Sequence, residues 1–161
     1  IPHYESDPLY IDALVNSINK KINEISWKPD LIIASYHGIP KKYFDKGDPY
    51  HCYCHKTTRL ISEKFSSVKI KTTFQSRFGP QEWLQPYTDK TLENLPKEGV
   101  KNVLTICPGF ASDCVETLEE IQIQAKESFL NSGGENFDMV PCLNDNSDHI
   151  ILLKSLIERN I

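Results

Sequence analysis

The stretch "LIIASYHGIP", from Leu31 to Pro40, turns from an apolar run into a polar break. Its first half predicts a buried strand over residues 30–36. Gly38 and the proline then favour a loop, so His37 falls where the strand ends. A strand end fixes a side chain better than a mobile loop does. His37 is therefore either a neutral histidine that bonds to backbone, or a base or metal ligand on a rigid element.

Strand-like and helical patterns alternate along the chain. Runs rich in apolar or β-branched residues predict strands over residues 30–36, 69–76, 102–107 and 137–142. Apolar residues at helical spacing predict helices over residues 8–25, 51–66, 88–98, 113–131 and 146–159. This succession predicts an α/β fold with a four-stranded parallel sheet flanked by helices. Because parallel strands end at one edge, where ligands bind, we expect His37 to lie there with the loops after the other strands.

The composition limits the class of protein. A chain of 161 residues has the size of one domain, with 39% hydrophobic and 25% charged residues. A net charge of -4 and scattered basic residues argue against nucleic-acid binding. No membrane span or signal peptide is visible, and five cysteines are an odd number for a disulfide framework, so we expect a reducing cytoplasm. The chain begins with Ile1 instead of Met, so we expect that the natural N-terminus precedes it.

The segment "PGFASDCVETLEEI", residues 108–121, joins a loop to an acidic helix. Asp113 and Glu116 have the spacing of a capping box, which is the structural interpretation of both. On a 3.6-residue wheel, one side carries Val115, Leu118, Gln122, Ala125 and Phe129, with Ile121 at its margin, and the opposite side carries Glu116, Glu120, Ile123 and Glu127. Glu116 and Glu120 then project together, either as a solvated acidic face or as a carboxylate ladder that suits a divalent cation.

The motif "HCYCH", from His51 to His55, has the residue types of a metal site. Zinc sites usually combine a Cys-x2-4-Cys pair with a second, distant pair of ligands. Here a single residue separates Cys52 from Cys54, and no matching second pair exists because the other cysteines, Cys107, Cys114 and Cys142, are spread over other elements. The pattern therefore argues against a structural zinc or iron–sulfur site.

Aromatic residues surround a Gly-Pro turn in the loop that follows the second predicted strand. Phe74, Phe78 and Trp83 lie there beside Arg77. They could form the floor of a flat apolar ligand site, or fold back onto the core, as we expect first for Phe74 at the strand end.

Four motifs together resemble the ferrochelatases, enzymes that insert ferrous iron into a porphyrin. They are "SYHGIPKKYFDKGDPY", "FQSRFGPQEWLQPYTD", "NVLTICPGFASDCVETLEEI" and "CLNDN", in the family's order and at its approximate spacing. Family members have roughly twice this length and hold the porphyrin between two similar α/β halves. The resemblance implies that residues 1–161 are the C-terminal α/β domain, a Rossmann-like half-domain of the bacterial type, without the N-terminal half.

The resemblance also assigns site residues. It implies that His37, Glu116 and Glu120 are catalytic, that His37 and Glu116 bind the metal, and that Tyr36, Phe78, Trp83 and Phe110 line the porphyrin pocket. In the implied mechanism, a bent porphyrin turns a pyrrole nitrogen toward His37, which takes up a proton, and the acidic row carries protons or iron. Cys114 is a departure, because some members have a proton-relaying histidine there.

The implied activity is a lyase reaction of heme biosynthesis, a metal chelation carried out in the cytoplasm by the full-length enzyme. Fe2+ is then a substrate, and we expect neither a tightly bound cofactor nor an iron–sulfur cluster. The implied partners are the porphyrin, ferrous iron and the protein's own N-terminal half, with no nucleic acid; peripheral membrane association and the choice between protoporphyrin and coproporphyrin stay open. Two alternatives also stay open: a cobalt chelatase of corrinoid synthesis, and a half that binds metal or porphyrin without catalysis.

Overall fold

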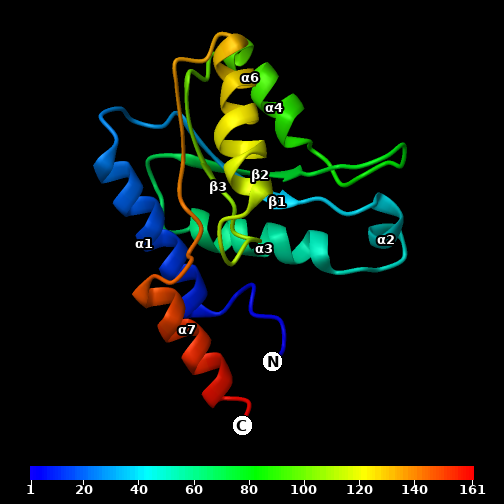
Figure 1. Ribbon diagram of the computed structural model, residues 1–161, viewed down its shortest axis with the longest axis vertical. Coiled ribbons are helices and arrows are strands. Elements are labelled where there is room, and N and C mark those ends of the chain that lie inside the picture. Colours follow the sequence, from blue (N-terminus) through cyan, green and yellow to red (C-terminus); the bar gives the residue numbers. More distant parts are fainter.

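Four parallel strands form one sheet, in the order β2-β1-β3-β4, in the computed structural model, which describes residues 1–161 (Figure 1). The strands are β1 Leu31–His37, β2 Lys69–Gln75, β3 Asn102–Ile106 and β4 Asn136–Met139. Each pairing is parallel, and β1 lies between β2 and β3, with Leu31 in register with Lys69 and Val103. The predicted fold class and all four strands are confirmed, with ends that shift by up to three residues.

Helices cover both faces of the sheet. They are α1 Pro8–Glu24, α2 Lys41–Asp45, α3 Tyr50–Ser62, α4 Thr88–Asn94, α5 Val115–Leu118, α6 Lys126–Asn131 and α7 Ser147–Glu158, with a 3-10 turn at Leu95–Glu98 and a π-helical segment, η2, at Glu120–Ala125. Figure 1 shows α1, α3 and α7 on one side of the sheet and α4 and α6 on the other. The short helix α2 was not predicted and lies in the expected loop after β1.

The central strand β1 separates two cores. Ile32, Ala34 and Tyr36 pack with α1, α3 and α7, whereas Leu31 and Ile33 pack with α4, η2 and α6. The first six residues of β1 are buried, which explains the unbroken apolar run in the sequence. The hydrophobic effect therefore fixes the place of β1, and with it the place of His37 at its end.

The predicted helix over residues 113–131 is confirmed from Val115 onward, but the side predicted to be buried is wrong in its first two turns. Val115, Leu118 and Ile123 are 67%, 46% and 47% exposed, although the wheel placed the first two toward the core. Instead the buried side of this segment consists of Thr117, Ile121, Ala125 and Phe129, spaced four residues apart. The cause is the π turn: the Gln124 amide donates to the carbonyl of Glu119, five residues back, so each turn holds more than 3.6 residues.

Gly38 allows the loop after β1 to lie directly against β2. Its amide donates to the Gln75 carbonyl at 2.8 Å. A Cβ atom on Gly38 would lie 2.9 Å from that carbonyl oxygen and 3.2 Å from Cε3 of Trp83. The lack of a side chain is therefore required by the close approach of two backbone segments.

We expect Gly38→Ala to lower the free energy of unfolding by about 1–3 kcal/mol, because the new methyl group overpacks against backbone. Gly109→Ala is the matched control, since its Cβ would meet nothing closer than Tyr36 Cδ1 at 3.4 Å. Urea unfolding followed by circular dichroism measures both. Equal stability of the two variants would show that the loop relaxes freely and that Gly38 is not constrained.

Candidate active site

His37 ends β1 at the carboxyl edge of the sheet, in register with Gln75 of β2. Its Nδ1 lies 2.7 Å from the carbonyl oxygen of Gly38, which can only accept, so Nδ1 carries the proton in the neutral ring. Nε2 is then left with a free lone pair, which can take up a proton or bind a metal. The Tyr50 hydroxyl donates to the His37 carbonyl at 2.8 Å, so the residue is held on both its backbone and its ring.

Glu116 lies close to His37, although 79 positions separate them in the sequence. A hydrogen bond from the Cys114 side chain lowers the pKa of the Glu116 carboxyl group, and its own backbone amide and nearby His37 lower it further. The carboxylate is therefore ionised at neutral pH beside an imidazole with an available nitrogen. That these two residues act together in one site stays a prediction.

Only a pair of ligands is available at this point. No cluster of three or more His, Cys, Asp or Glu side chains that could hold a metal ion exists in the chain. A cation placed between His37 and Glu116 would take its other ligands from water or from a substrate. Such a site differs from the closed four-ligand sites of structural zinc.

Glu120 has different partners from Glu116. Its carboxylate accepts from the Ser76 amide at 2.7 Å, from the Ser76 hydroxyl at 2.5 Å and from Gln75 Nε2 at 3.3 Å. Ser76 has a φ of 61°, a left-handed conformation that a non-glycine residue rarely adopts. Glu120 therefore holds the strained end of β2, and it also lines a polar cavity of about 320 Å³ with Arg77 and Asp89.

Gln75 links β1 to the helix that carries Glu116, and it was not identified from the sequence. Its Oε1 accepts from the buried Ser35 hydroxyl at 2.7 Å, and its Nε2 donates to the Glu116 carbonyl at 2.7 Å. The residue is 3% exposed, and its bond to Ser35 is buried while the bond to Glu116 is partly buried. The one signal in the sequence is an uncharged polar residue at the end of a predicted strand.

The loops after β3 and β4 are tied together by Asp113 and Asn144. The Asp113 amide donates to Asn144 Oδ1 at 2.8 Å, and Asn144 Nδ2 donates back to Asp113 Oδ2 at 2.8 Å. Burial opposes ionisation of Asp113, but the hydrogen bonds from Asn144 and Cys142 outweigh it and lower the pKa of Asp113. The predicted capping box of Asp113 and Glu116 is wrong, because the helix begins one residue later, with Cys114 as its N-cap.

The aromatic residues that the resemblance assigns to the porphyrin pocket lie on the loop after β2, in the case of Phe78 and Trp83, and near the end of β1, in the case of Tyr36 and Phe110. Phe78 is 84% exposed, and its carbonyl accepts from Trp83 Nε1 at 2.9 Å, so both lie on the loop after β2. Phe110 has its ring centroid 6.2 Å from that of His37. Tyr36 is 3% exposed, with its hydroxyl bonded to Thr58 Oγ1 at 3.0 Å. Phe74, at 2% exposure, packs in the core, as we expected first for it.

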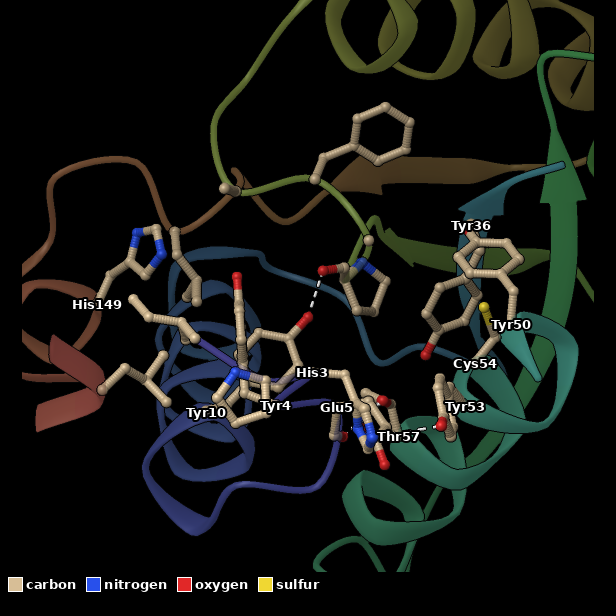
Figure 2. A pocket seen from close by; sticks show the side chains of 18 of the residues that line it. His3, Tyr4, Glu5, Tyr10, Tyr36, Tyr50, Tyr53, Cys54, Thr57 and His149 are labelled. Atoms are coloured by element: carbon tan, nitrogen blue, oxygen red, sulfur yellow. Dashed lines mark hydrogen bonds and ion pairs between the residues drawn. The ribbon is translucent and has the colours of Figure 1, made fainter. Parts of the chain in front are cut away.

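A cavity of about 510 Å³ adjoins Phe110, between the N-terminal segment, α3, α7 and the loop after β3 (Figure 2). Figure 2 shows tyrosine rings from several elements around it, namely Tyr4, Tyr10, Tyr36, Tyr50 and Tyr53. The Tyr10 hydroxyl donates to the Pro108 carbonyl, which anchors the loop that carries Phe110. Because Tyr50 also contacts His37, this cavity and the His37–Glu116 pair share one wall.

The helices show no membrane-spanning candidate: none combines the required length with the required hydropathy.

Comparison with known proteins gives concordant results. A family model described as "Ferrochelatase" matches residues 1–161. A protein named ferrochelatase from Rhizobium meliloti (strain 1021) is 56% identical over 163 residues, which cover 100% of this chain and 48% of that protein. One from Brucella ovis (strain ATCC 25840 / 63/290 / NCTC 10512) is 51% identical over 163 residues, covering 100% and 46%. The chain thus spans about half the length of the curated relatives it matches.

A solved structure supports the fold. The multi-domain protein DR2241 from Deinococcus radiodurans, described as structurally similar to chelatases, superposes with a TM-score of 0.61 at 10% sequence identity. The match covers 92% of this chain and 29% of that one. At this identity the match establishes the α/β architecture alone.

The two acidic residues are expected to differ in their effect on stability. Glu120→Gln should lower the free energy of unfolding by about 1–3 kcal/mol, because an amide nitrogen would then face the donors of Ser76. Glu116→Gln is the matched control and should leave stability unchanged within error, since that carboxylate accepts from Cys114 and its own backbone amide and holds no distant segment. Urea titrations at pH 7 measure both. A stable Glu120→Gln variant would contradict the assigned role of Glu120.

Proposed function

Because the chain belongs to the ferrochelatase family, we propose that it is part of an enzyme that inserts ferrous iron into a porphyrin, a lyase reaction of heme biosynthesis. One observation supports this activity above the others. At the carboxyl edge of the sheet, His37 has Nδ1 committed to a carbonyl and Nε2 free, beside the ionised carboxylate of Glu116. A proton acceptor next to a cation ligand is what metal insertion into a protonated ring requires.

We propose that residues 1–161 form the C-terminal of two halves. The relatives are about twice as long as this chain, and the matching region covers 48% of the first of them. His37 lies at the carboxyl edge of the sheet, with Glu116 close by. The other half would supply that wall and close the site on the second face of the macrocycle.

Porphyrin metallation releases two pyrrole protons as the metal enters. In the proposed reaction, His37 Nε2 accepts a pyrrole proton while its Nδ1 stays bonded to Gly38, so the ring keeps one orientation through the transfer. Iron is the substrate, and proton loss and metal entry are coupled because the ring nitrogens bind metal only once deprotonated.

Glu116 would act as the first carboxylate of the metal path, since its lowered pKa keeps it charged at neutral pH. Glu120 would follow one turn later, at the polar cavity that Arg77 and Asp89 also line. Cys114 supports Glu116 through a hydrogen bond, so a thiol stands where some family members carry an imidazole.

The macrocycle would lie against Phe110, Phe78 and Trp83, with Tyr36 behind the first of them in the adjoining cavity. Aromatic rings match the flat apolar surface of a porphyrin. A cytoplasmic, reducing location forms part of the proposal, because all five cysteines are free thiols in the structure. The identity of the porphyrin and any contact with a membrane surface are left to experiment.

In the full-length protein, His37→Ala should lower the rate of iron insertion at least about a hundredfold, because the proton acceptor is lost. Porphyrin binding, followed by fluorescence quenching, should remain within about threefold, since the aromatic wall is unchanged. An unchanged unfolding temperature serves as the control for folding. Near-normal turnover by this variant would rule out the assigned role of His37.

The 161-residue chain alone should fold and show no measurable iron insertion. A porphyrin must be held on both faces to be bent, and the strain must come from contacts remote from the reacting atoms. A metal-insertion assay on this chain, beside the full-length protein, tests the expectation. Comparable turnover would show that one wall suffices and that the two-wall argument is wrong.

A further inference from the structure

Helix α3 carries two histidines one turn apart, His51 and His55. Residues at positions i and i+4 share one side of a helix, and here the two ring centroids are 4.4 Å apart with planes inclined by 46°. The same spacing places two imidazoles on one metal ion in the H-E-x-x-H motif. The pattern "HCYCH", which does not fit a cysteine-based zinc site, thus also contains a His-x3-His pair at its two ends.

The two rings have no partner in the chain. Of the five histidines, His3, His37 and His149 each have a ring nitrogen within hydrogen-bond distance of another group. His51, which is partly exposed, and His55, which is exposed, have neither a hydrogen bond nor an ion pair. Their nitrogens are therefore available for an external ligand.

Aromatic packing holds the first ring in place. The His51 ring stacks on Phe74 at 5.7 Å with planes inclined by 20°, and Phe44 of α2 lies 4.8 Å from it. The His55 ring lies 6.3 Å from Phe74. Phe74 is itself buried at the end of β2, so the pair rests on a rigid element, which favours a defined ligand geometry.

The local charges also suit a cation. Burial lowers the pKa of His51, and burial with the neighbouring His51 lowers the pKa of His55, so both lone pairs are free at neutral pH. The next residue along this side of α3, Arg59, is paired with Glu63 at 2.8 Å. Of the other cations on α2 and α3, Lys41 is paired with Asp45 and Lys56 with Glu5. Lys42 lies over the Tyr43 ring, 5.5 Å from its centroid.

Neither cysteine of the motif belongs to the pair. Cys54 is buried beneath Tyr50, and desolvation raises the pKa of its thiol to about 12, so it is not a thiolate at neutral pH. Cys52 is exposed but follows His51 directly, and successive residues point about 100° apart on a helix.

We propose that His51 and His55 bind one divalent transition-metal ion of borderline softness, such as Zn2+, through two imidazole nitrogens, with water as the remaining ligands. Imidazole nitrogens bind Zn2+ at about 2.0–2.1 Å. The site is separate from the His37–Glu116 pair and does not depend on the proposed catalytic function. It lies on the helix whose first residue, Tyr50, anchors His37.

The test is a Zn2+ titration of the purified 161-residue chain, followed by calorimetry and by NMR of the histidine rings. One ion should shift the signals of His51 and His55 together. His51→Ala and His55→Ala should each weaken this binding at least about tenfold, because one of two ligands is lost. Cys52→Ser and the exposed-histidine control His3→Ala should change it by less than about twofold.

His37→Ala separates this site from the candidate active site and should retain the ion at His51 and His55. Because His51 packs on Phe74, unfolding temperatures without Zn2+ check each variant, and the exposed His55→Ala decides if His51→Ala is unstable. Unchanged Zn2+ affinity in His55→Ala, or its loss in Cys52→Ser, would overturn the two-imidazole assignment. Loss in His37→Ala alone would show that the candidate active site is the one place where zinc binds.

Discussion

The buried amide of Gln75 is the constraint on which the arrangement of the site depends. Its backbone carbonyl accepts a hydrogen bond from the Gly38 amide, and its Oε1 accepts one from the Ser35 hydroxyl. Its Nε2 donates to the carbonyl of Glu116. One residue at the end of β2 thus fixes the loop that carries His37 and the helix that carries Glu116. A buried polar group without partners costs free energy, so these bonds act together: the loss of one leaves another donor or acceptor unsatisfied away from water.

The parallel sheet could be predicted because its signals are local. The apolar run of β1, the β-branched residues of β2 and the helical spacing of α1 each act through neighbouring residues, and the observed bounds follow them closely. For the helix after β3, the predicted buried side was wrong for a physical reason. A wheel assumes 3.6 residues per turn, and the π turn at η2 rotates the buried side onto Thr117 and Ile121.

The candidate site was predictable only in part. A strand end placed His37, and the resemblance placed Glu116, but the tautomer of His37 depends on a carbonyl whose direction no pattern states. Asp113 looked like a helix cap because its true partner, Asn144, lies 31 positions further along the chain. Glu120 and Glu116 looked equivalent because their spacing is helical, yet Glu120 holds a left-handed Ser76 and Glu116 accepts from Cys114 and its own backbone amide. The structural role of Asp113 and of Glu120 thus depends on a hydrogen-bond partner from a distant segment.

A structural metal site and a site that transfers its metal to a substrate differ in the number of ligands that the protein supplies. Structural metals sit in closed sets of four ligands, and their binding stabilises the fold. The His37–Glu116 pair offers two donors on separate elements, which would hold a cation weakly and leave most of its positions to other ligands. A macrocycle with four nitrogens can then compete successfully for the ion. Weak binding by this half therefore suits the proposed insertion reaction, because tight binding of the substrate metal would lower its energy and slow its transfer.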